Sequence, residues 1–412
     1  MPSPPGLDER RAALSMLDAV MRRGQTLESA ASSVTSRLGA ADRRLALAIA
    51  GETLRRLPAL DTMIDSRTRQ PLPDDSKARM VLRLALAQKL ALDVPDHAIV
   101  ATALPLVDGG PRRLVHGVLG SLLRGKLTSE NLLPPSVEER WLAAWGEDVV
   151  AAARRMILER PALDISFCDD AAAQGYPLGS SLAPMHRRLE SAAVQGLPGY
   201  EDGNWWVQDL ASSLPARLIP ASARRVLDLC AAPGGKTMQL AAAGHDVTAL
   251  DRSESRLARL RENLARTGLE ATTIPADVVE WKPGDPFDAV LLDAPCSATG
   301  TFRRHPEVLY RARDSIIASS AELQSQLLDR AADSLRVGGS LVYAVCSLEP
   351  PEGEQQVRAF LDRHRHFRLE PAKTDVAGLV PSPEGWLRIL PGMLEEQGGL
   401  DGFFTAHLVR DR

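Results

Sequence analysis

Carboxylates and thiols repeatedly follow hydrophobic segments in the C-terminal half of this 412-residue sequence. Asp251, Asp277 and Asp293 each stand at the end of a segment whose composition predicts a β-strand, and Cys346 ends another. A single Asp in such a place is often only a helix cap or a turn residue. Strands that alternate with helices form a parallel sheet, however, and their carboxyl ends meet at the edge where ligands bind. The repetition therefore predicts a functional site at that edge.

The segment 226–237, Val-Leu-Asp-Leu-Cys-Ala-Ala-Pro-Gly-Gly-Lys-Thr, is the centre of this predicted site. Its first residues predict a buried strand that ends at Cys230, and a helix is expected to begin near Lys236. Gly234-Gly235 in the intervening turn let the backbone approach a ligand closely, and free amides at the helix N-terminus face that ligand. Such a turn is typical of a site for a nucleotide-like cofactor.

The identity of the cofactor follows from what the segment lacks. A phosphate-binding loop needs a glycine where Cys230 stands, and Pro233 removes an amide that phosphates would use. The Gly-x-Gly-x-x-Gly pattern of dinucleotide sites is also absent. S-adenosylmethionine carries ribose, adenine and a positive sulfonium but no phosphate. It suits Asp251, roughly 20 residues beyond the turn and placed for ribose hydroxyls, and Asp277, which could reach the base.

Two cysteines near neighbouring strand ends, Cys296 and Cys346, suggest covalent catalysis. Position 5 of a pyrimidine is a poor nucleophile, but a thiolate added at position 6 makes it enamine-like and able to take a methyl group. A carboxyl group must hydrogen-bond the ring nitrogen or the exocyclic amine during attack, and Asp293 is placed for that. The target base must lie outside its stack, so it is single-stranded or flipped.

The C-terminal part is expected to form the α/β sheet that positions these groups. We predict a mostly parallel, doubly wound sheet. Its last two strands could pair in antiparallel fashion at one edge. The expected strands are 225–230, 246–250, 272–276, 287–292, 340–345, 387–390 and 403–408, and the expected helices are 209–218, 236–243, 254–267, 315–335 and 352–364.

The N-terminal part is expected to be a helical bundle without a catalytic constellation. Apolar residues recur at helical spacing in 12–21, 45–54, 78–92, 97–107 and 114–123. Residues 1–126 hold 19 Lys and Arg against 13 Asp and Glu, a net charge of +6, and the remainder carries −10. The excess indicates either an anionic partner such as RNA or a solvated Arg-rich surface. The candidate phosphate contacts are the pairs Arg10-Arg11, Arg22-Arg23, Arg43-Arg44, Arg55-Arg56 and Arg112-Arg113.

Composition excludes several other classes of protein. No apolar stretch is long enough to cross a membrane, and the N-terminus lacks the apolar core of a signal peptide, so we expect a cytoplasmic protein without a membrane partner. The four cysteines have neither disulfide-framework nor metal-ligand spacing, so no metal is expected. Aromatic residues make up 4% of the chain, too few for a dominant stacking platform for nucleic acid.

The motifs together resemble the bacterial ribosomal-RNA (cytosine-5) methyltransferases of the Sun/Fmu (RsmB) type over nearly the whole chain. The resemblance implies a NusB-like helical RNA-binding domain at 5–127, a small α+β subdomain at 135–203 and a Rossmann-like class I methyltransferase domain at 204–412. The motifs that carry it are Val-Gln-Asp at 207–209, Asp-Leu-Cys-Ala-Ala-Pro-Gly-Gly-Lys-Thr at 228–237, Asp-Ala-Pro-Cys-Ser-Ala-Thr-Gly-Thr at 293–301, Arg-Arg-His-Pro at 303–306, Cys-Ser-Leu-Glu-Pro at 346–350 and Gly-Gly-Leu-Asp-Gly-Phe-Phe at 398–404.

The resemblance assigns roles that the chemistry leaves open. It implies that Cys346 is the nucleophile, that Cys296 assists release of the product and that Lys236 positions rather than catalyses. The cofactor contacts that it implies are Cys230, Ala231, Ala232, Pro233, Gly234, Gly235, Lys236, Asp251, Asp277 and Asp293.

Three places depart from the family pattern. Val345 replaces the usual Thr before the nucleophile, which removes a hydroxyl but keeps a β-branched strand residue. Segment 165–168 stands where many members have a basic stretch, and 115–120 lacks the usual Asn and terminal Arg. The departures at 165–168 and 115–120 concern RNA contacts and the target nucleotide, whereas Val345 is expected to leave the activity intact.

We therefore expect an S-adenosylmethionine-dependent RNA (cytosine-5) methyltransferase that acts as a monomer on small-subunit (16S) rRNA. A tRNA target remains an alternative. Two further hypotheses stay open: a class I methyltransferase for protein or small molecules, which would need no second cysteine, and a non-catalytic RNA-binding or regulatory protein. The intact Cys296 and Cys346 argue against both.

Overall fold

A computed structural model describes residues 4–36, 38–125, 127, 130–190 and 194–411. The chain divides into two compact units. The first, helical unit comprises Met1–Glu139, Ala153–Glu159 and Phe302–Arg311, and the second, sheet-containing unit comprises Arg140–Ala152, Arg160–Thr301 and Ala312–Arg412.

The helical unit is built around two buried apolar clusters on α1, α3, α4 and α6. Thr26 and Ser76 cap α2 and α4, because their side chains accept hydrogen bonds from the N–H groups of Ser29 and Arg79. Its elements are α1 (Leu7–Arg23), α2 (Leu27–Val34), α3 (Ala40–Asp65), α4 (Lys77–Ala91), α5 (Asp96–Ala103), the 3-10 turn η1 (Leu104–Leu106) and α6 (Gly109–Leu123). The next helices, α7 (Pro135–Trp145) and α8 (Glu147–Met156), are each divided between the two units.

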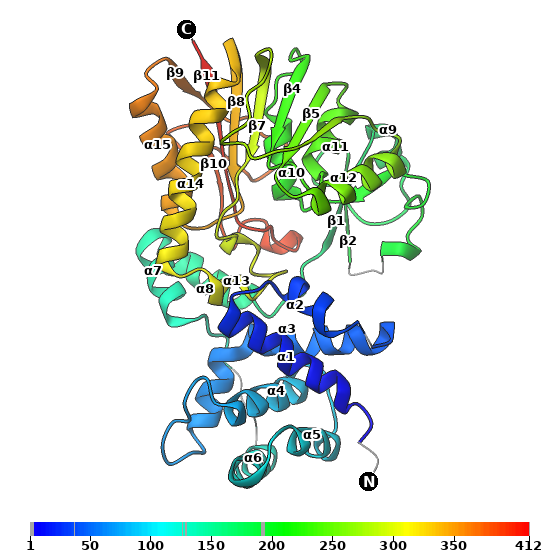
Figure 1. Ribbon diagram of the computed structural model, residues 1–412, viewed down its shortest axis with the longest axis vertical. Helices are drawn as coiled ribbons and strands as arrows, with labels where there is room; N and C mark the ends of the chain where they lie inside the picture. Colours follow the sequence, from blue (N-terminus) through cyan, green and yellow to red (C-terminus); the bar gives the residue numbers. More distant parts are fainter. Residues whose placement is uncertain (1–3, 37, 126, 128–129, 191–193, 412) are drawn as a thin grey trace. The chain divides into compact units, whose positions relative to one another are not determined.

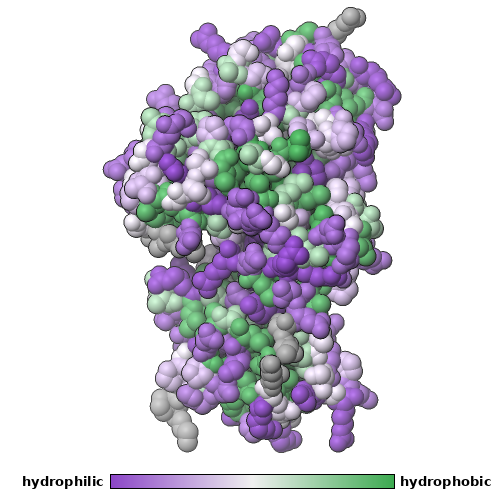
Figure 2. Space-filling model, turned by 180° about the vertical axis from the view of Figure 1, so that it is seen from behind, coloured by the Kyte–Doolittle hydropathy of each residue, from purple (hydrophilic) through white to green (hydrophobic). Residues whose placement is uncertain are grey.

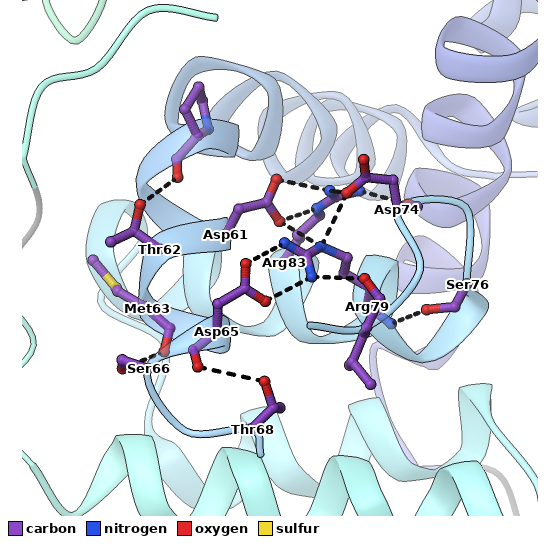
Figure 3. A network of polar contacts seen from close by, with 12 residues as sticks. Asp61, Thr62, Met63, Asp65, Ser66, Thr68, Asp74, Ser76, Arg79 and Arg83 are labelled. Carbon is purple, nitrogen blue, oxygen red and sulfur yellow. Dashed lines mark hydrogen bonds and ion pairs between the residues drawn. The ribbon is translucent and has the colours of Figure 1, made fainter. Parts of the chain in front are cut away.

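A buried network of ion pairs joins α3 to α4 (Figure 3). Arg79 donates to Asp65 at 2.7 Å and to Asp61 at 2.9 Å, and Arg83 donates to both oxygens of Asp61 at 2.7 Å. The hydrogen bond that Arg79 donates to Asp65 raises the pKa of Arg79. Because bidentate Arg–carboxylate pairs fix geometry as well as charge, these arginines stabilise the bundle and are not candidates for RNA contact.

The arginine pairs predicted as phosphate contacts differ in exposure. Arg10 is buried and donates to Gln88 at 2.8 Å, and Arg55 and Arg56 are 12–13% exposed beside Glu52. These three side chains therefore make contacts within the helical unit and are not available for RNA. Other candidates remain on the surface: Arg11, Arg22, Arg23, Arg43, Arg44, Arg112 and Arg113 are exposed.

A segment from the second half of the sequence completes the helical unit. It contains α13 (Val308–Arg311), where the Tyr310 hydroxyl donates to the carbonyl of Leu54 at 2.8 Å. Glu307 is buried and accepts from the N–H of Leu27 at 3.1 Å. The Arg-Arg-His-Pro motif at 303–306 therefore belongs to this unit.

The second unit begins with a small antiparallel sheet in the order β2-β1-β3. Its core residue Asp164 is fully buried and accepts from Arg188 and from the N–H of Leu210, and His186 Nε2 lies 3.2 Å from its Oδ1. Burial opposes ionisation, but these hydrogen bonds outweigh it and lower the pKa of Asp164. The elements are β1 (Leu163–Phe167), α9 (Asp170–Gly175), β2 (His186–Leu189), the 3-10 turn η2 (Val194–Gly196) and β3 (Trp205–Val207).

The main sheet has the order β10-β11-β8-β7-β4-β5-β6, with β9 also paired to β11. The neighbours from β8 to β6 are parallel, whereas β11 runs antiparallel to β8, β9 and β10. The predicted doubly wound sheet and its antiparallel edge are thus confirmed. The strands are β4 (Arg225–Leu229), β5 (Asp246–Asp251), β6 (Thr272–Pro275), β7 (Phe287–Asp293), β8 (Leu335–Val345), β9 (Phe367–Glu370), β10 (Leu387–Ile389) and β11 (Phe403–Arg410).

Helices cover both faces of this sheet (Figure 1). The helices α14 (Asp314–Asp333) and α15 (Glu354–Arg363) pack with one apolar cluster. On the other face lie α10 (Leu210–Arg217), α11 (Gly235–Ala242) and α12 (Glu254–Thr267). Short 3-10 turns, η3 (Thr299–Thr301), η4 (Pro350–Glu352) and η5 (Glu395–Gln397), lie in the connecting loops.

Some element boundaries differ from the sequence expectations. The apolar pattern predicted the last helix of the bundle over 114–123, but α6 begins earlier, at Gly109, because Pro111 is tolerated in a first helical turn. The strand expected to end at Cys230 ends at Leu229. The short helix α2 and the edge strand β9 had no predicted counterpart.

Hydrophilic side chains cover most of the face shown in Figure 2, with smaller hydrophobic areas between them. Within the described residues, no helix combines the length and apolarity that a membrane crossing needs.

Candidate active site

The glycine loop between β4 and α11 is shaped by backbone conformations that few residues adopt. Cys230 has φ 59° and Gly234 has φ 108°, and the peptide bond between Ala232 and Pro233 is cis. A Cβ at Gly234 would lie 2.8 Å from Leu260 Cγ, so only glycine fits there. α11 begins at Gly235 without a side-chain cap among the described residues, which leaves its first amides for a ligand.

Two of the predicted cofactor acids lie at the expected sheet edge and also support the local backbone. Asp251 is 3% exposed, and its two oxygens accept from the N–H groups of Ala232 at 3.2 Å and Ser253 at 2.9 Å. It therefore fixes the glycine loop. Asp277 is exposed and accepts from the N–H of Val279 at 2.9 Å, as a turn residue does. Their contacts to ribose and adenine remain predictions.

The third acid, Asp293, forms an ion pair with the lysine of the glycine loop. Lys236 Nζ lies 2.7 Å from Asp293 Oδ2 and 5.3 Å from the centre of the Phe403 ring. The Lys236 side chain is 10% exposed and that of Asp293 is 30% exposed. The pair joins the start of α11 to the end of β7. Within it, Lys236 donates the hydrogen bond and the Asp293 carboxylate accepts it.

The structure brings the two predicted catalytic thiols into contact. The Sγ atoms of Cys296 and Cys346 lie 3.5 Å apart, and both side chains are partly exposed. Cys296 follows β7 and Cys346 follows β8, its parallel neighbour. The N–H of Gly300 donates to the carbonyl of Cys346 at 3.0 Å, which ties the two loops together.

Burial and neighbouring groups raise the pKa of two of the strand-end cysteines, Cys230 and Cys296. Burial, with nearby carboxylates, raises the pKa of Cys230 to about 12, so this residue is not a nucleophile at neutral pH. The hydrogen bond with Cys346, together with burial, raises the pKa of Cys296 well above its ordinary value. Cys296 therefore keeps its proton and can direct an S–H toward Cys346.

Several residues around the thiols were missed in the sequence. Gly402 donates from its N–H to the carbonyl of Gly300 at 2.8 Å, so the segment 398–404 closes over the Cys296 loop. The buried Arg388 donates to the carbonyl of Ser347 at 2.5 Å and pairs with Glu354 at 2.7 Å. Glu352 is fully buried between the two loops. The sequence did hold a signal for this support: a serine directly follows each cysteine, and Glu352 comes shortly after Cys346.

The doubly wound sheet, its glycine loop and its strand-end acids define the methyltransferase class of α/β proteins. Residues 215–409 match the family described as 16S rRNA methyltransferase RsmB/F, and residues 7–124 match the NusB family. In the described part of the chain, no three or more His, Cys, Asp or Glu residues are grouped to hold a metal ion.

Full-length relatives narrow the class to one family. The ribosomal RNA small subunit methyltransferase B of Citrobacter koseri is 34% identical and covers 97% of this chain and 98% of its own length. That of Pseudomonas syringae pv. tomato is 33% identical, with 98% and 97% covered. The chain belongs to the RsmB family of S-adenosylmethionine-dependent 16S rRNA methyltransferases, with an N-terminal NusB domain.

Solved structures share the fold. The crystal structure of PH0851 aligns over 98% of both chains with a TM-score of 0.75 at 24% identity. NSun6 from Pyrococcus horikoshii, solved with SFG, aligns over 68% of this chain and 99% of its own with a TM-score of 0.60 at 20% identity. The predicted fold class and family are thus confirmed.

Proposed function

We propose that the protein transfers a methyl group from S-adenosylmethionine to C5 of a cytosine in 16S rRNA, with Cys346 as the nucleophile. The observation that carries this proposal is the contact between Cys346 and a protonated Cys296 at the sheet edge that also holds the Lys236–Asp293 pair. One thiol can attack while the other holds a proton beside it, which suits covalent catalysis on a pyrimidine.

The glycine loop fits the cofactor. Its left-handed backbone, the uncapped N-terminus of α11 and the carboxylates of Asp251 and Asp293 together offer amides to polar groups and negative charge to a sulfonium. The residues that would hold the cofactor are Cys230–Lys236, Asp251, Asp277 and Asp293. When bound, S-adenosylmethionine supplies an electrophilic methyl group.

The side chains then act on the base. Cys346 loses its S–H proton to water, and the thiolate Sγ forms a bond to C6, while Asp293 accepts a hydrogen bond from the exocyclic amine, since the ion pair with Lys236 presents it as an acceptor. The electron pair of the C5–C6 double bond would then take the methyl group, with S-adenosylhomocysteine as the leaving product. Water would remove the C5 proton, and the electron pair left behind would re-form the C5–C6 double bond as the Sγ–C6 bond breaks and the thiolate leaves. The S–H of Cys296 stabilises the departing thiolate of Cys346, which accounts for a role in product release.

The remaining expectations are part of the same proposal. The domain boundaries are 5–127, 135–203 and 204–412, the first domain contacts RNA through exposed arginines, and the protein works in the cytoplasm as a monomer. Light scattering of the purified chain at several concentrations tests the oligomeric state. A dimer mass at all concentrations contradicts it.

Methyl transfer from labelled S-adenosylmethionine tests the proposal. The substrates are 16S rRNA and tRNA from cells that lack the protein, and Cys346→Ala is the matched inactive variant. We expect label in 16S rRNA only, and bisulfite sequencing then gives the modified cytosine. Label in tRNA alone would support the alternative substrate. No transfer to either RNA, with RNA binding retained, would support the non-catalytic alternative.

A further inference from the structure

A buried carboxylate cross-links the two cysteine loops. Glu352 Oε1 accepts from the N–H of Ser297 at 2.8 Å, and Oε2 accepts from the hydroxyls of Ser297 and Ser347, the latter at 2.5 Å. The two hydroxyl oxygens lie 3.1 Å from each other. Ser297 directly follows Cys296 and Ser347 directly follows Cys346, so one side chain holds the neighbours of both thiols.

The carboxylate is itself held from several directions. The Tyr343 hydroxyl, on β8, donates to the backbone carbonyl of Glu352 at 2.6 Å. Gln324, on α14, donates to Glu352 Oε1 at 3.3 Å and to the carbonyl of Pro295 at 3.0 Å. Burial raises the pKa of Glu352, and the four donors oppose that rise. Because Glu352, Tyr343 and Gln324 are all fully buried, the carboxylate has no freedom to move away.

We propose that Glu352 is a positioning residue that sets the separation of the two catalytic thiols through Ser297 and Ser347. The thiols follow different strands, and the sheet alone leaves the loops beyond β7 and β8 free to part. Thr299 adds to the same cluster, since its hydroxyl accepts from the N–H of Leu348 at 3.0 Å. The hydrogen bonds of the Glu352 carboxylate go to Ser297, Ser347 and Gln324 and not to the thiol sulfurs, although its charge contributes to the raised pKa of Cys296.

The role depends on the reach of the side chain rather than on its charge. In Glu352→Gln the side chain keeps its length, and the amide can accept from the Ser297 N–H and donate to both hydroxyls, whose protons rotate. In Glu352→Asp the charge is kept, but the carboxylate is one methylene too short to bridge both serines. A positioning role therefore predicts that Gln preserves function better than Asp, and a charge effect on Cys296 predicts the reverse.

The spacing can be measured without methyl transfer. Phenylarsine oxide condenses with two thiols, forming two As–S bonds and releasing water, and it needs both sulfurs close together. Peptide mass spectrometry after alkylation shows whether Cys296 and Cys346 are protected. We expect wild type and Glu352→Gln to bind with similar affinity and Glu352→Asp to bind about tenfold more weakly or worse, as small displacements of reacting groups have large effects. Cys346→Ala, which lacks one of the two thiols, gives the background of arsenical binding elsewhere in the protein.

A neighbouring buried glutamate gives the matched control. Glu349 is 2% exposed, and its side chain accepts from Arg140 and Trp141. It reaches Ser347 only through its backbone N–H, which Glu349→Gln keeps, so this variant should leave arsenical binding unchanged. Binding of S-adenosylhomocysteine verifies the fold of each variant. If Glu352→Asp does not fold, Ser347→Ala removes one arm of the bridge and carries the same expectation. The proposal is overturned if a folded Glu352→Asp or Ser347→Ala binds phenylarsine oxide with wild-type affinity. It is also overturned if Glu352→Gln loses more arsenical affinity than Glu352→Asp does.

The kinetic consequence rests on the proposed function. With Cys296 displaced, Glu352→Asp should lower kcat with little change in KM and slow the release of the covalent RNA adduct. Suppose that Glu352→Asp binds phenylarsine oxide weakly, but neither it nor Cys296→Ala accumulates a covalent RNA adduct. The positioning role then stands and the proposed chemistry is contradicted. Suppose instead that Cys296→Ala accumulates the adduct, while Glu352→Asp binds the arsenical and releases RNA as wild type does; the positioning role alone is then contradicted.

Discussion

Cys296 and Cys346 share a sulfur–sulfur contact of 3.5 Å, and this contact, together with burial, raises the pKa of Cys296. The proposed roles of the two thiols give opposite behaviour in the two alanine variants. Cys296→Ala should trap the protein on RNA as a covalent adduct, since the departing thiolate loses its S–H donor, whereas Cys346→Ala should form none. A denaturing gel with labelled RNA checks this. Adduct in Cys346→Ala and none in Cys296→Ala would exchange the two roles.

The Lys236–Asp293 pair predicts a large catalytic loss in Asp293→Asn. An amide at this position presents donors as well as an acceptor and loses the ion pair, so activation of the base should fall by about 100-fold or more in kcat. Single-turnover methyl transfer with saturating cofactor is the measurement. The exposed Asp285, in the loop before β7, serves as the control in Asp285→Asn. Equal rates for the two variants would remove Asp293 from the mechanism.

The exposed pair Arg112-Arg113 should contribute to RNA affinity. Both lie near the start of α6, where the helix dipole disfavours positive charge, so their presence does not help the fold. Replacing both with Ala should weaken RNA binding and reduce the slope of log affinity against log salt by up to about 2. Arg22→Ala with Arg23→Ala is the comparison, since both arginines pair with Asp18. Unchanged affinity and slope would place the RNA contact elsewhere.

Asp228 should make stability depend on pH. It is fully buried in β4, accepts from the Thr237 hydroxyl at 2.6 Å, and has an Oδ1 atom without a partner among the described residues. Burial raises its pKa to about 7. Between its unfolded and folded pKa values the native state binds more protons, so the free energy of unfolding falls as pH rises through this window.

Asp228→Asn removes this titration. The free energy of unfolding of wild type minus that of the variant should therefore decrease from about pH 4 to about pH 7, by at most about 4 kcal/mol. Urea denaturation of both chains at a series of pH values measures the difference. A difference that stays constant or increases over this range would show that Asp228 is ionised in the fold.

The close approach of the Gly300 and Gly402 backbones predicts that a side chain at Gly300 causes a steric clash. A Cβ at Gly300 would lie 2.0 Å from the backbone oxygen of Gly402, whereas a Cβ at Gly284 would meet nothing within 4 Å. Gly300→Ala should therefore destabilise the protein by about 1–3 kcal/mol and reduce activity, and Gly284→Ala should stay within about 0.5 kcal/mol of wild type. Denaturation midpoints and methyl transfer are the readouts. A fully active, stable Gly300→Ala would mean that the two loops can separate.

The sheet edge could be predicted from the sequence because its determinants are local. Alternating strands and helices imply a parallel sheet, and that alone brings Asp293 and Cys346 to one edge. The support of the thiols could not be predicted in this way. In the sequence, Glu352 is the first residue of the predicted helix 352–364, where a carboxylate usually lies exposed, and its burial depends on Ser297, 55 residues earlier in the chain.

The helical domain shows the same limit. Its periodicity predicts helices, but Arg10 and Arg112 look alike in the sequence. Only the packing of α1 against Gln88 makes Arg10 a buried structural residue, while Arg112 remains exposed. The Arg79–Asp65 and Arg83–Asp61 pairs likewise join helices through residues whose spacing carries no signal.

The hydrogen bond between Gly300 and Gly402 also sets an order of events during synthesis of the chain. Both cysteines are made well before residue 402, yet the loop that closes over Cys296 arrives only with the segment leading into β11. A nascent chain that already contains Cys296 and Cys346 therefore has its thiols without their final support. Methylating competence should therefore appear only after residues 398–404 have been made.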